Sequence, residues 1–480
     1  MTAKKKKTAK PVAVKLSNNF QRLVRAGFDA AQTTKDNARH WSMADACSAD
    51  AEARHDVRHT LRIRSRYEIL NNSYARGVVN MLANDTIGTG PRLQFLSDDE
   101  ELNEKIEKDF ACWSSEIHLA QLLRLMRMAR CQDGETFAVI GTNPKLKNPV
   151  KIKIDVIEAD RIQSEDFTDE FGDLTVDGIK YDAYGNAVSY QMLKYHPGDD
   201  RRCNSLEYLT IPAEYMIHSF IKYRPGLHRG VPELTAALPL FAQLRRYNLA
   251  TLAAAESAAD FAAILYTDAP PDGETDAIEP LDSIPLERNM MLTVPAGWKM
   301  GQLEAKHPTA NHSEFVKCIL SELARCISAT YGTVAGDFSG FNYASGRLDN
   351  QIYQRSILVD RSLWESEVLN PLFEAWLREW SLVNHVSIQN DILHEWFWDG
   401  FLHVDPTKEA NAQQTKLENL LTTLTDEYAK QGMDFYKKMK VKAREMKLLR
   451  ELGIVSEQNE QSSGNQNRKT KQEEDKDDEE

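Results

Sequence analysis

The sequence lacks the short motifs that identify common ATPases and hydrolases. Gly88, Thr89 and Gly90 are not followed by the lysine and hydroxyl residue of a phosphate-binding loop. No His-Glu-x-x-His pair is present, and between Gly336 and Gly340 the serine stands one position too late for a serine-hydrolase elbow. We therefore expect neither an ATPase motor nor a serine hydrolase.

Cysteine pairs and long apolar runs are also missing. The six cysteines form no Cys-x-x-Cys pair, which excludes a zinc ribbon of the usual spacing and favours buried thiols over a disulfide framework. No stretch approaches the roughly 20 apolar residues that span a bilayer, and no apolar signal core follows the N-terminal lysines. We expect a protein made in the cytoplasm, with no membrane partner. The cysteines are Cys47, Cys112, Cys131, Cys203, Cys318 and Cys326.

Positive charge is scarce over most of the chain. The 59 Lys and Arg residues are outnumbered by 72 Asp and Glu residues, which gives a net charge of -13 and a pI near 5.5. Proteins that hold duplex DNA by phosphate contacts are usually basic, so this class is disfavoured, although DNA passing by is not excluded. Residues 1–40 predict a flexible basic arm, and residues 454–480, rich in Gln, Asn, Lys, Asp and Glu, predict a disordered charged tail.

Apolar periodicity predicts helices and strands in separate stretches. Ile106, Phe110 and Trp113 recur at spacings of three and four, as in the amphipathic helices that we expect over 100–131. The segment 41–90 also has a mostly helical pattern, and so does 407–453, with a break near Gly432.

The period changes to two between about 135 and 220, as in Ile152, Ile154 and Val156. A hairpin turn is expected over 184–186, which read Tyr-Gly-Asn. This stretch predicts a mixed sheet.

An alanine-rich stretch predicts one long helix over 233–266, in which Pro239 marks either a kink or the true start. Residues 267–308 hold six of the 17 prolines, too many for a long helix, and indicate a compact insertion of loops and strands. A second helix is expected after this insertion, from a cap at Asn311 or Ser313 to a stop at Gly332.

A third helical pattern follows over 347–380, and Pro371 is expected to kink it. The stretch that separates it from the second helix reads TVAGDFSGFNYASGR (333–347). Its glycines permit unusual backbone angles, while Phe338, Phe341 and Tyr343 offer apolar or stacking surface. A flexible aromatic loop between two rigid helices is the most informative functional feature, although an ordinary packed loop has the same composition.

Arginines are clustered between residues 54 and 66. Guanidinium groups bind phosphate in a bidentate manner, but in so acidic a chain they can equally pair with carboxylates of a neighbouring subunit. The same two interpretations apply to Arg124, Arg127 and Arg130. The candidates for phosphate or intersubunit contacts are Arg58, Arg62, Arg64 and Arg66.

Two histidines in this cluster, His55 and His59, have the spacing of metal ligands on one helical face. The surrounding arginines would repel a divalent cation, so a solvated basic helix is the favoured interpretation and no metal site is predicted.

Short blocks in a fixed order run through most of the chain. They are LRIRSRYEILNNSYARGVV (61–79), GTGPRLQ (88–94), DGETF (133–137), IEADRI (157–162), GIKYDAYGNAVSY (178–190), IPAEYMIHSF (211–220), RPGLHRGVPEL (224–234), NYASGR (342–347) and VDPTKEANA (404–412). Together they resemble the lambda family of phage portal proteins over roughly residues 40–453. Two departures stand out: Ala344 and Ser345 replace a frequent serine pair, and both ends of the chain match nothing in the family.

The resemblance implies an α+β portal fold with a wing, a two-helix stem, a clip insertion, a kinked long helix and a helical crown. The expected segments are the N-terminal arm (1–40), the wing of helices and mixed sheet (41–232), the first stem helix (233–266), the clip (267–308), the second stem helix (309–332), the tunnel loop (333–346), the kinked helix with the wing return (347–405), the crown (406–453) and the tail (454–480).

The same resemblance implies a structural function with no enzymatic activity, no cofactor and no metal. A dodecameric ring at one capsid vertex would form the channel for DNA packaging and ejection and would nucleate head assembly. The expected partners are other copies of this chain, non-specific double-stranded viral DNA, the terminase large subunit, the major capsid protein and scaffold, and head-completion or tail-adaptor proteins. The expected location is the portal vertex of the virion, after assembly in the host cytoplasm.

The tunnel loop would line the channel and touch the DNA backbone without reading sequence. Three alternatives remain at this point: another phage head or connector protein, a metal-dependent packaging nuclease that uses His55 and His59, and a prophage copy that no longer serves a virion. The residues expected to face the channel are Gly336, Asp337, Phe338, Ser339, Gly340, Phe341, Asn342 and Tyr343.

Overall fold

The chain divides into two compact units, Met1–Ser48 and Ala49–Glu480. In the first unit the described residues form turns, and the second unit carries all the described helices and strands. The predictions for the N-terminal arm, most of the clip and the charged tail lie outside the described residues. The computed structural model describes residues 38–164, 174–200, 207–260, 264–267, 298–301, 311–388, 393–401 and 406–454.

Five helices begin the second unit, and local caps explain where they start and stop. The side chain of Asn72 accepts two backbone N–H groups at the start of α3 and so separates it from α2. Gly134 ends α5 at a φ of 94°, in the left-handed region, where a Cβ would also overlap the backbone of Val231. The helices predicted over 41–90 and 100–131 are confirmed. The bounds are α1 (Ala49–Glu52), α2 (His55–Asn71), α3 (Ser73–Ile87), α4 (Glu100–Glu116) and α5 (Leu119–Asp133).

The described strands pair only in antiparallel fashion, in the orders β3-β2-β8, β4-β5-β6-β7, β1-β11 and β9-β10. The α+β class and the turn over 184–186, which joins β5 to β6, are confirmed. The prediction of a mixed sheet is wrong, because no described pair of strands is parallel. Short connections, typical of antiparallel pairs, join β2 to β3, β4 to β5 and β5 to β6, and β2 also pairs antiparallel with the distant β8. The bounds are β1 (Arg92–Leu96), β2 (Glu135–Thr142), β3 (Ile152–Ile157), β4 (Leu174–Val176), β5 (Ile179–Tyr181), β6 (Ala187–Leu193), β7 (Tyr208–Pro212), β8 (Met216–Phe220), β9 (Ile264–Thr267), β10 (Trp298–Gly301) and β11 (Leu393–Phe397).

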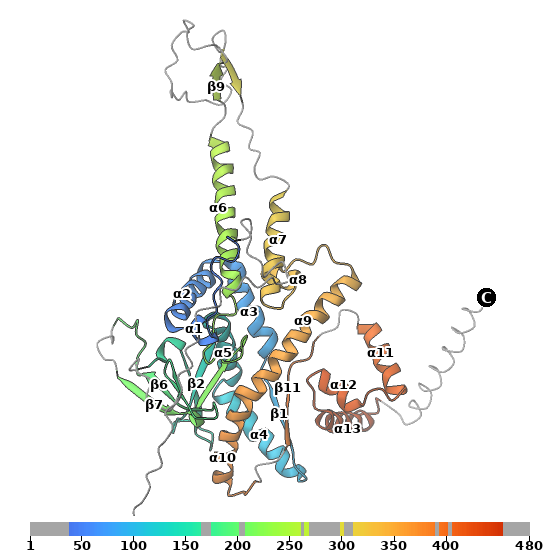
Figure 1. Ribbon diagram of the computed structural model, residues 1–480. Helices are drawn as coiled ribbons and strands as arrows, with labels where there is room; N and C mark the ends of the chain where they lie inside the picture. Colours follow the sequence, from blue (N-terminus) through green and yellow to red (C-terminus); the bar gives the residue numbers. More distant parts are fainter. Residues whose placement is uncertain are drawn as a thin grey trace, which may run out of the picture. The chain divides into compact units, whose positions relative to one another are not determined.

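An aromatic core joins the helices to segments far along the chain. Phe110 on α4 packs edge-on against Phe373 and Trp376, with ring centroids 5.7 and 5.1 Å apart. Strand β11 lies beside β1 in this region (Figure 1), although about 300 residues separate the two. The apolar stripe predicted for 100–131 is therefore buried, and Ile106 and Trp113 have no exposed surface.

Helices α6 (Leu238–Asp260) and α7 (Asn311–Cys326) contact each other side by side (Figure 1). Pro239 lies in the first turn of α6, so its interpretation as the helix start is confirmed. The predicted helix over 233–266 is too long at both ends. A 3-10 turn (Thr235–Ala237) precedes α6, and the β-branched and aromatic residues of β9 pair with β10.

The second predicted helix was also too long. It ends well before Gly332, because Ser328 adopts a left-handed φ of 54° and breaks the helix. A new short helix, α8 (Tyr331–Ala335), then starts at a reciprocal cap between Thr330 and Thr333. Gly332 thus lies inside a helix and does not end one.

The long helix that follows is interrupted as predicted. Helix α9 (Tyr343–Trp364) passes into a π-helical turn (Glu365–Leu369) and then into α10 (Asn370–Asn384). Pro371 lies at the start of α10 and has no N–H for the carbonyl of Glu367, which accounts for the position of the irregular turn.

Three C-terminal helices complete the described chain, and a turn at Gly432 with a φ of 69° separates the last two. A Cβ at Gly432 would overlap the carbonyl oxygen of Trp398, so the break also lets this segment approach the residues after β11. The predicted helices and their break are confirmed. The bounds are α11 (Pro406–Glu418), α12 (Leu424–Lys430) and α13 (Phe435–Glu451).

The prediction of buried cysteines is wrong at three positions. Cys131 is buried in a helix face, whereas Cys47, Cys112 and Cys318 are exposed and Cys326 is half-buried. Cysteine type alone therefore did not reveal which helix face each residue occupies. Among the described residues, no helix combines the length and the apolarity needed to cross a bilayer.

Candidate functional site

The candidate site is the loop between α8 and α9, which is shorter than predicted and comprises residues 336–342. Gly336 ends α8 at a φ of 66°, which only glycine adopts without strain. Asn342 begins α9 by accepting the backbone N–H of Ser345 at 2.8 Å. The loop is thus held at both ends, and residues 336–340 are exposed between them.

A fixed carboxylate shapes the exposed part of this loop. Asp337 accepts the backbone N–H and the hydroxyl of Ser339 at 3.0 and 2.7 Å and the hydroxyl of Tyr331 at 3.2 Å. These bonds, those from Ser339 above all, lower the pKa of Asp337. The loop therefore presents a permanent negative charge, which repels phosphate and does not bind it.

Two aromatic rings form the other feature of the loop. The rings of Phe338 and Phe341 lie 5.8 Å apart, and 56% of Phe338 is exposed. They border a hollow of about 480 Å³ that also reaches Arg347 in the first turns of α9. A Cβ on Gly332 would lie 2.7 Å from the Phe338 ring, so this glycine permits the ring to lie close to α8.

The predicted channel-facing residues thus occupy one short exposed loop, except at its last position. Tyr343 starts α9, and its side chain lies outside the described residues. Whether the loop faces a channel is a property of an assembly, so that role remains a prediction.

The predicted role of the arginine cluster needs correction. Arg58 and Arg62 are 2% and 3% exposed, so neither is available to phosphate or to a neighbouring subunit. Their partners, and those of Arg66, are carboxylates of the same chain: Asp177 for Arg58, Glu135 and Asp160 for Arg62, and Asp133 and Asp160 for Arg66. Burial, reinforced by the nearby Arg229, lowers the pKa of Arg58 to about 9. Among the four candidates, only Arg64 keeps an exposed side chain; Arg54, at the edge of the cluster, is also exposed and pairs with Asp56 at 3.1 Å.

Glu135, at the start of β2, is the centre of this buried ion network, and its side chain has no exposed surface. It accepts hydrogen bonds from Arg62, from Arg229 at 2.7 and 2.9 Å, from the Gly230 N–H at 3.1 Å, and lies 3.2 Å from Nε2 of His218. Burial alone would raise the pKa of Glu135. Arg229, His218 and Arg62 outweigh burial and hold that pKa well below its usual range.

A second buried network ties the helix that carries the loop to the rest of the subunit. Asp360 on α9 accepts a bond from Arg127 at 2.8 Å, a bond from Arg130, and the Thr86 hydroxyl at 2.9 Å. Glu233 binds both arginines from the other side, at 3.0 Å each. The interpretation of Arg127 and Arg130 as phosphate or intersubunit contacts is therefore wrong.

Sequence reasoning missed the carboxylates of both networks, although a signal was present. Glu135 lies in the block DGETF, Asp160 in IEADRI, and Arg229 and Glu233 in RPGLHRGVPEL. Charged residues next to apolar strand residues, in blocks that also carry the arginines, are candidates for buried pairs. The pattern does not reveal which carboxylate meets which arginine, because the partners are far apart in sequence, as with Arg62 and Glu135 at 73 residues and Arg229 and Glu135 at 94.

The two histidines of the cluster form no metal-ligand set. His55 lies 3.2 Å from Asp177 and stacks on His59, with ring centroids 6.1 Å apart. Within the described ranges, no three His, Cys, Asp or Glu residues are placed to hold a metal ion. The predicted solvated helix is half correct, because its histidines face outward while Arg58 and Arg62 face inward.

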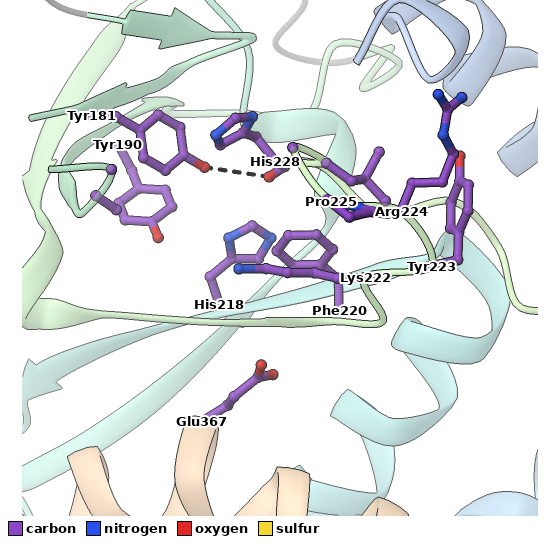
Figure 2. A pocket seen from close by; sticks show the side chains of 14 residues that line it. Tyr181, Tyr190, His218, Phe220, Lys222, Tyr223, Arg224, Pro225, His228 and Glu367 are labelled. Carbon is purple, nitrogen blue, oxygen red and sulfur yellow. Dashed lines mark hydrogen bonds between the residues drawn. The ribbon is translucent and has the colours of Figure 1, made fainter. Parts of the chain in front are cut away.

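A second hollow, of about 550 Å³, lies beside β8. Tyr181, Tyr190, His218 and Phe220 border it, and the carboxylate of Glu367 points toward it from the π-helical turn (Figure 2). One oxygen of Glu367 is buried without a hydrogen-bond partner among the described residues. Burial raises the pKa of Glu367.

Glutamine at position 367 is expected to stabilise the subunit at neutral pH. A carboxyl whose pKa is raised by folding contributes stability below its unfolded pKa of about 4.5, and this contribution is lost as the pH rises through the folded pKa. Glu367→Gln should therefore raise the melting temperature near pH 8 and leave it almost unchanged near pH 4. An equal shift at both pH values would contradict a charge origin. Glu374→Gln on α10 is the control, because it removes the same charge from an exposed side chain.

Comparison with known proteins agrees with the resemblance in the sequence. Residues 34–361 match the family described as phage portal protein, lambda family. A probable portal protein of Halomonas phage phiHAP-1 is 24% identical over 446 residues, which cover 85% of this chain and 83% of that protein. The neck of an empty GTA particle contains a chain with a TM-score of 0.48 and 14% identity, and a native gene transfer agent virion contains one with 0.47 and 13%. Each likeness covers 83% of this chain and 99% of the other.

Proposed function

The chain belongs to the lambda family of phage portal proteins, and from this premise we propose that twelve copies form a ring at one capsid vertex, through which viral DNA is packaged and ejected. As a member of this family it is a structural protein and not an enzyme. The ring would be part of the virion, assembled in the host cytoplasm, and would nucleate head assembly. The observation that supports the channel proposal is the exposed loop 336–342, with its ionised Asp337 and its two aromatic rings.

This loop suits a DNA channel because it can contact DNA without binding its phosphates tightly. Each phosphate that Lys or Arg neutralises adds affinity and slows sliding. Residues 336–342 contain no Lys or Arg, expose the ionised Asp337 and present the rings of Phe338 and Phe341. Twelve copies would form a flexible constriction that positions DNA laterally through apolar contact and charge repulsion.

The segment order supports the proposed subdomains. Helices α6 and α7, which contact each other, would form the stem. Residues 267–308, which lie between them in sequence, would form the clip. The sheets with α2 to α5 would form the wing, α9 with α10 the kinked helix, and α11 to α13 the crown. We propose that the clip docks the terminase large subunit during filling and head-completion or tail-adaptor proteins afterwards, while the wing contacts the major capsid protein and scaffold.

Arg64 is the remaining arginine for an intersubunit contact. Its side chain is exposed on α2 between Ile63 and Tyr67, which are 53% and 52% exposed. Apolar side chains beside a cation fit an interface that is partly desolvated, where a carboxylate of the next subunit would set the orientation.

The first test is negative-stain electron microscopy with mass determination of the purified chain. A channelled ring of about twelve subunits is the expected result. A closed globular dimer without a channel would overturn the proposal. A monomer that stays monomeric with scaffold and capsid protein present would also overturn it.

The loop itself is tested by replacing residues 336–340 with alanine. At Gly336 a Cβ is strained in the left-handed region, and an alanine run also removes the carboxylate and one ring. We expect rings that still form but yield fewer DNA-filled heads or retain less DNA. Gly346→Ala is the matched control, because it lies within α9 and its Cβ would meet Phe341 at an ordinary 3.9 Å. Normal packaging by the alanine variant would contradict the channel role.

A further inference from the structure

Helix α13 stands out by its charge. Its 17 residues include seven Lys and Arg and two Glu, a net charge of +5 in a chain whose overall net charge is -13. None of its residues is buried. A basic helix of this density, most of whose residues are exposed, is typical of a surface that meets a polyanion.

One side of α13 is already held by acidic residues of the same subunit. Lys437 binds Glu107 and Lys440 binds Glu104, both on α4, and the side chain of Asp434 caps the helix start. The bond from Lys440 lowers the pKa of Glu104, so this pair stays charged. These contacts fix which side of α13 faces the subunit.

Another side carries cations that the subunit does not neutralise. At 100° per residue, Lys438 and Lys442 lie on the same side of the helix, turned away from Lys437 by about 100–140°. Both are exposed, and neither forms an ion pair with a described residue. Lys447 is also exposed without such a pair, but it lies on the side of Lys440, because five residues turn the helix by about 140° from Lys442.

We propose that Lys438 and Lys442 are the centre of a face that contacts the phosphate backbone of double-stranded DNA without reading bases. This inference rests on the proposed function, in which duplex DNA and the ring share one particle. Lysine ammonium groups act as point charges toward phosphate and do not require a particular base. The face would add a weak, salt-sensitive grip at the crown, whereas the loop 336–342 adds none.

An acidic segment at the C-terminus of the chain could also bind the face of Lys438 and Lys442. Its composition makes it a weaker partner for this face than duplex DNA. Residues 468–480 contain seven Asp and Glu, but three Lys and Arg directly precede them and Lys476 lies among them, so the net charge of this segment is only -3 (seven acidic minus four basic residues). Duplex DNA instead presents one uncompensated charge for about every 1.7 Å of its axis. Over a helix about 25 Å long, DNA is the stronger complement to α13.

The test measures how the purified ring binds a fluorescent 30-base-pair duplex of random sequence at several salt concentrations. In Lys438→Gln/Lys442→Gln, the slope of log affinity against log salt should fall by about 2, since each phosphate contact contributes about one. The matched control is Lys145→Gln/Lys147→Gln, which removes the same charge from two other exposed lysines. The control should leave the slope unchanged.

Two outcomes would overturn the inference. The first is an unchanged slope in the α13 variant, or an equal loss in the control. The second is DNA binding that depends on these lysines only after residues 473–480 are deleted, because the acidic segment would then occupy the face in the intact chain. Failure of the proposed function gives a different result, because the chain then forms no channelled ring. Failure of this inference alone leaves intact rings whose DNA binding does not depend on Lys438 and Lys442.

Discussion

Replacing Glu135 with glutamine is expected to lower the free energy of unfolding of the subunit by about 3–5 kcal/mol. The variant keeps the shape of the side chain but leaves Arg62 and Arg229, which are 3% and 1% exposed at their side chains, without their shared carboxylate. A buried guanidinium that loses its counter-charge keeps its desolvation cost. Because whole domains are stable by only about 5–15 kcal/mol, this one substitution should remove a large share of the stability.

Denaturant unfolding of the wild type and of Glu135→Gln measures this loss in the free energy of unfolding. Glu214→Gln is the matched control, because Glu214 is exposed and close in sequence to β8. The double variant Glu135→Gln/Arg229→Gln should lose less than the sum of the two single variants, since each single change already breaks the same contact. Additive losses would show that the two side chains act independently and would contradict the network.

The pH dependence of the same network has a definite sign. The folded pKa of Glu135 lies below its unfolded value of about 4.5. Its stabilising contribution is therefore present above that value and is lost as the pH falls toward the folded pKa. The wild type should approach the stability of Glu135→Gln in acid, and a gap that stays constant on acidification would contradict this assignment.

The sequence allowed elements with strong periodicity to be predicted, and strong local caps explain why. The stripe through Ile106, Phe110 and Trp113 requires a helix whose face is buried, and Gly134 forces α5 to end. Errors arose where the determining feature was a single backbone angle or a distant partner. Nothing local marks Ser328 as the residue that adopts a left-handed φ, and β9 is recognisable only with β10 beside it.

The candidate site was predictable in part, for the same physical reasons. Glycine and aromatic content marked the loop, but its limits depend on the caps at Thr330 and Asn342, which moved both ends inward. The arginines were recognised as important and were given the wrong partners. A guanidinium has the same sequence signature whether it faces phosphate or a buried carboxylate, and only the fold brings Glu135 to Arg62.

Replacing Asp360 with asparagine is expected to lower the free energy of unfolding by about 3–5 kcal/mol, as much as Glu135→Gln. Asp360 is the carboxylate by which α9 holds Arg127 and Arg130, whose side chains are 3% and 0% exposed. Burial would raise the pKa of Asp360, but these two arginines outweigh it and lower that pKa. In the variant only Glu233 remains for two buried guanidinium groups.

This substitution also tests how the loop is supported. Helix α9 carries the loop 336–342 at its start and Asp360 near its end, so a loosened α9 should let the loop move more. We expect faster proteolytic cleavage within the loop in Asp360→Asn rings at a denaturant concentration where the fold persists. Asp349→Asn, on the same helix and without an ion pair to a described residue, should leave the cleavage rate unchanged. Lower stability with an unchanged rate would show that the network holds the wing together without positioning the loop.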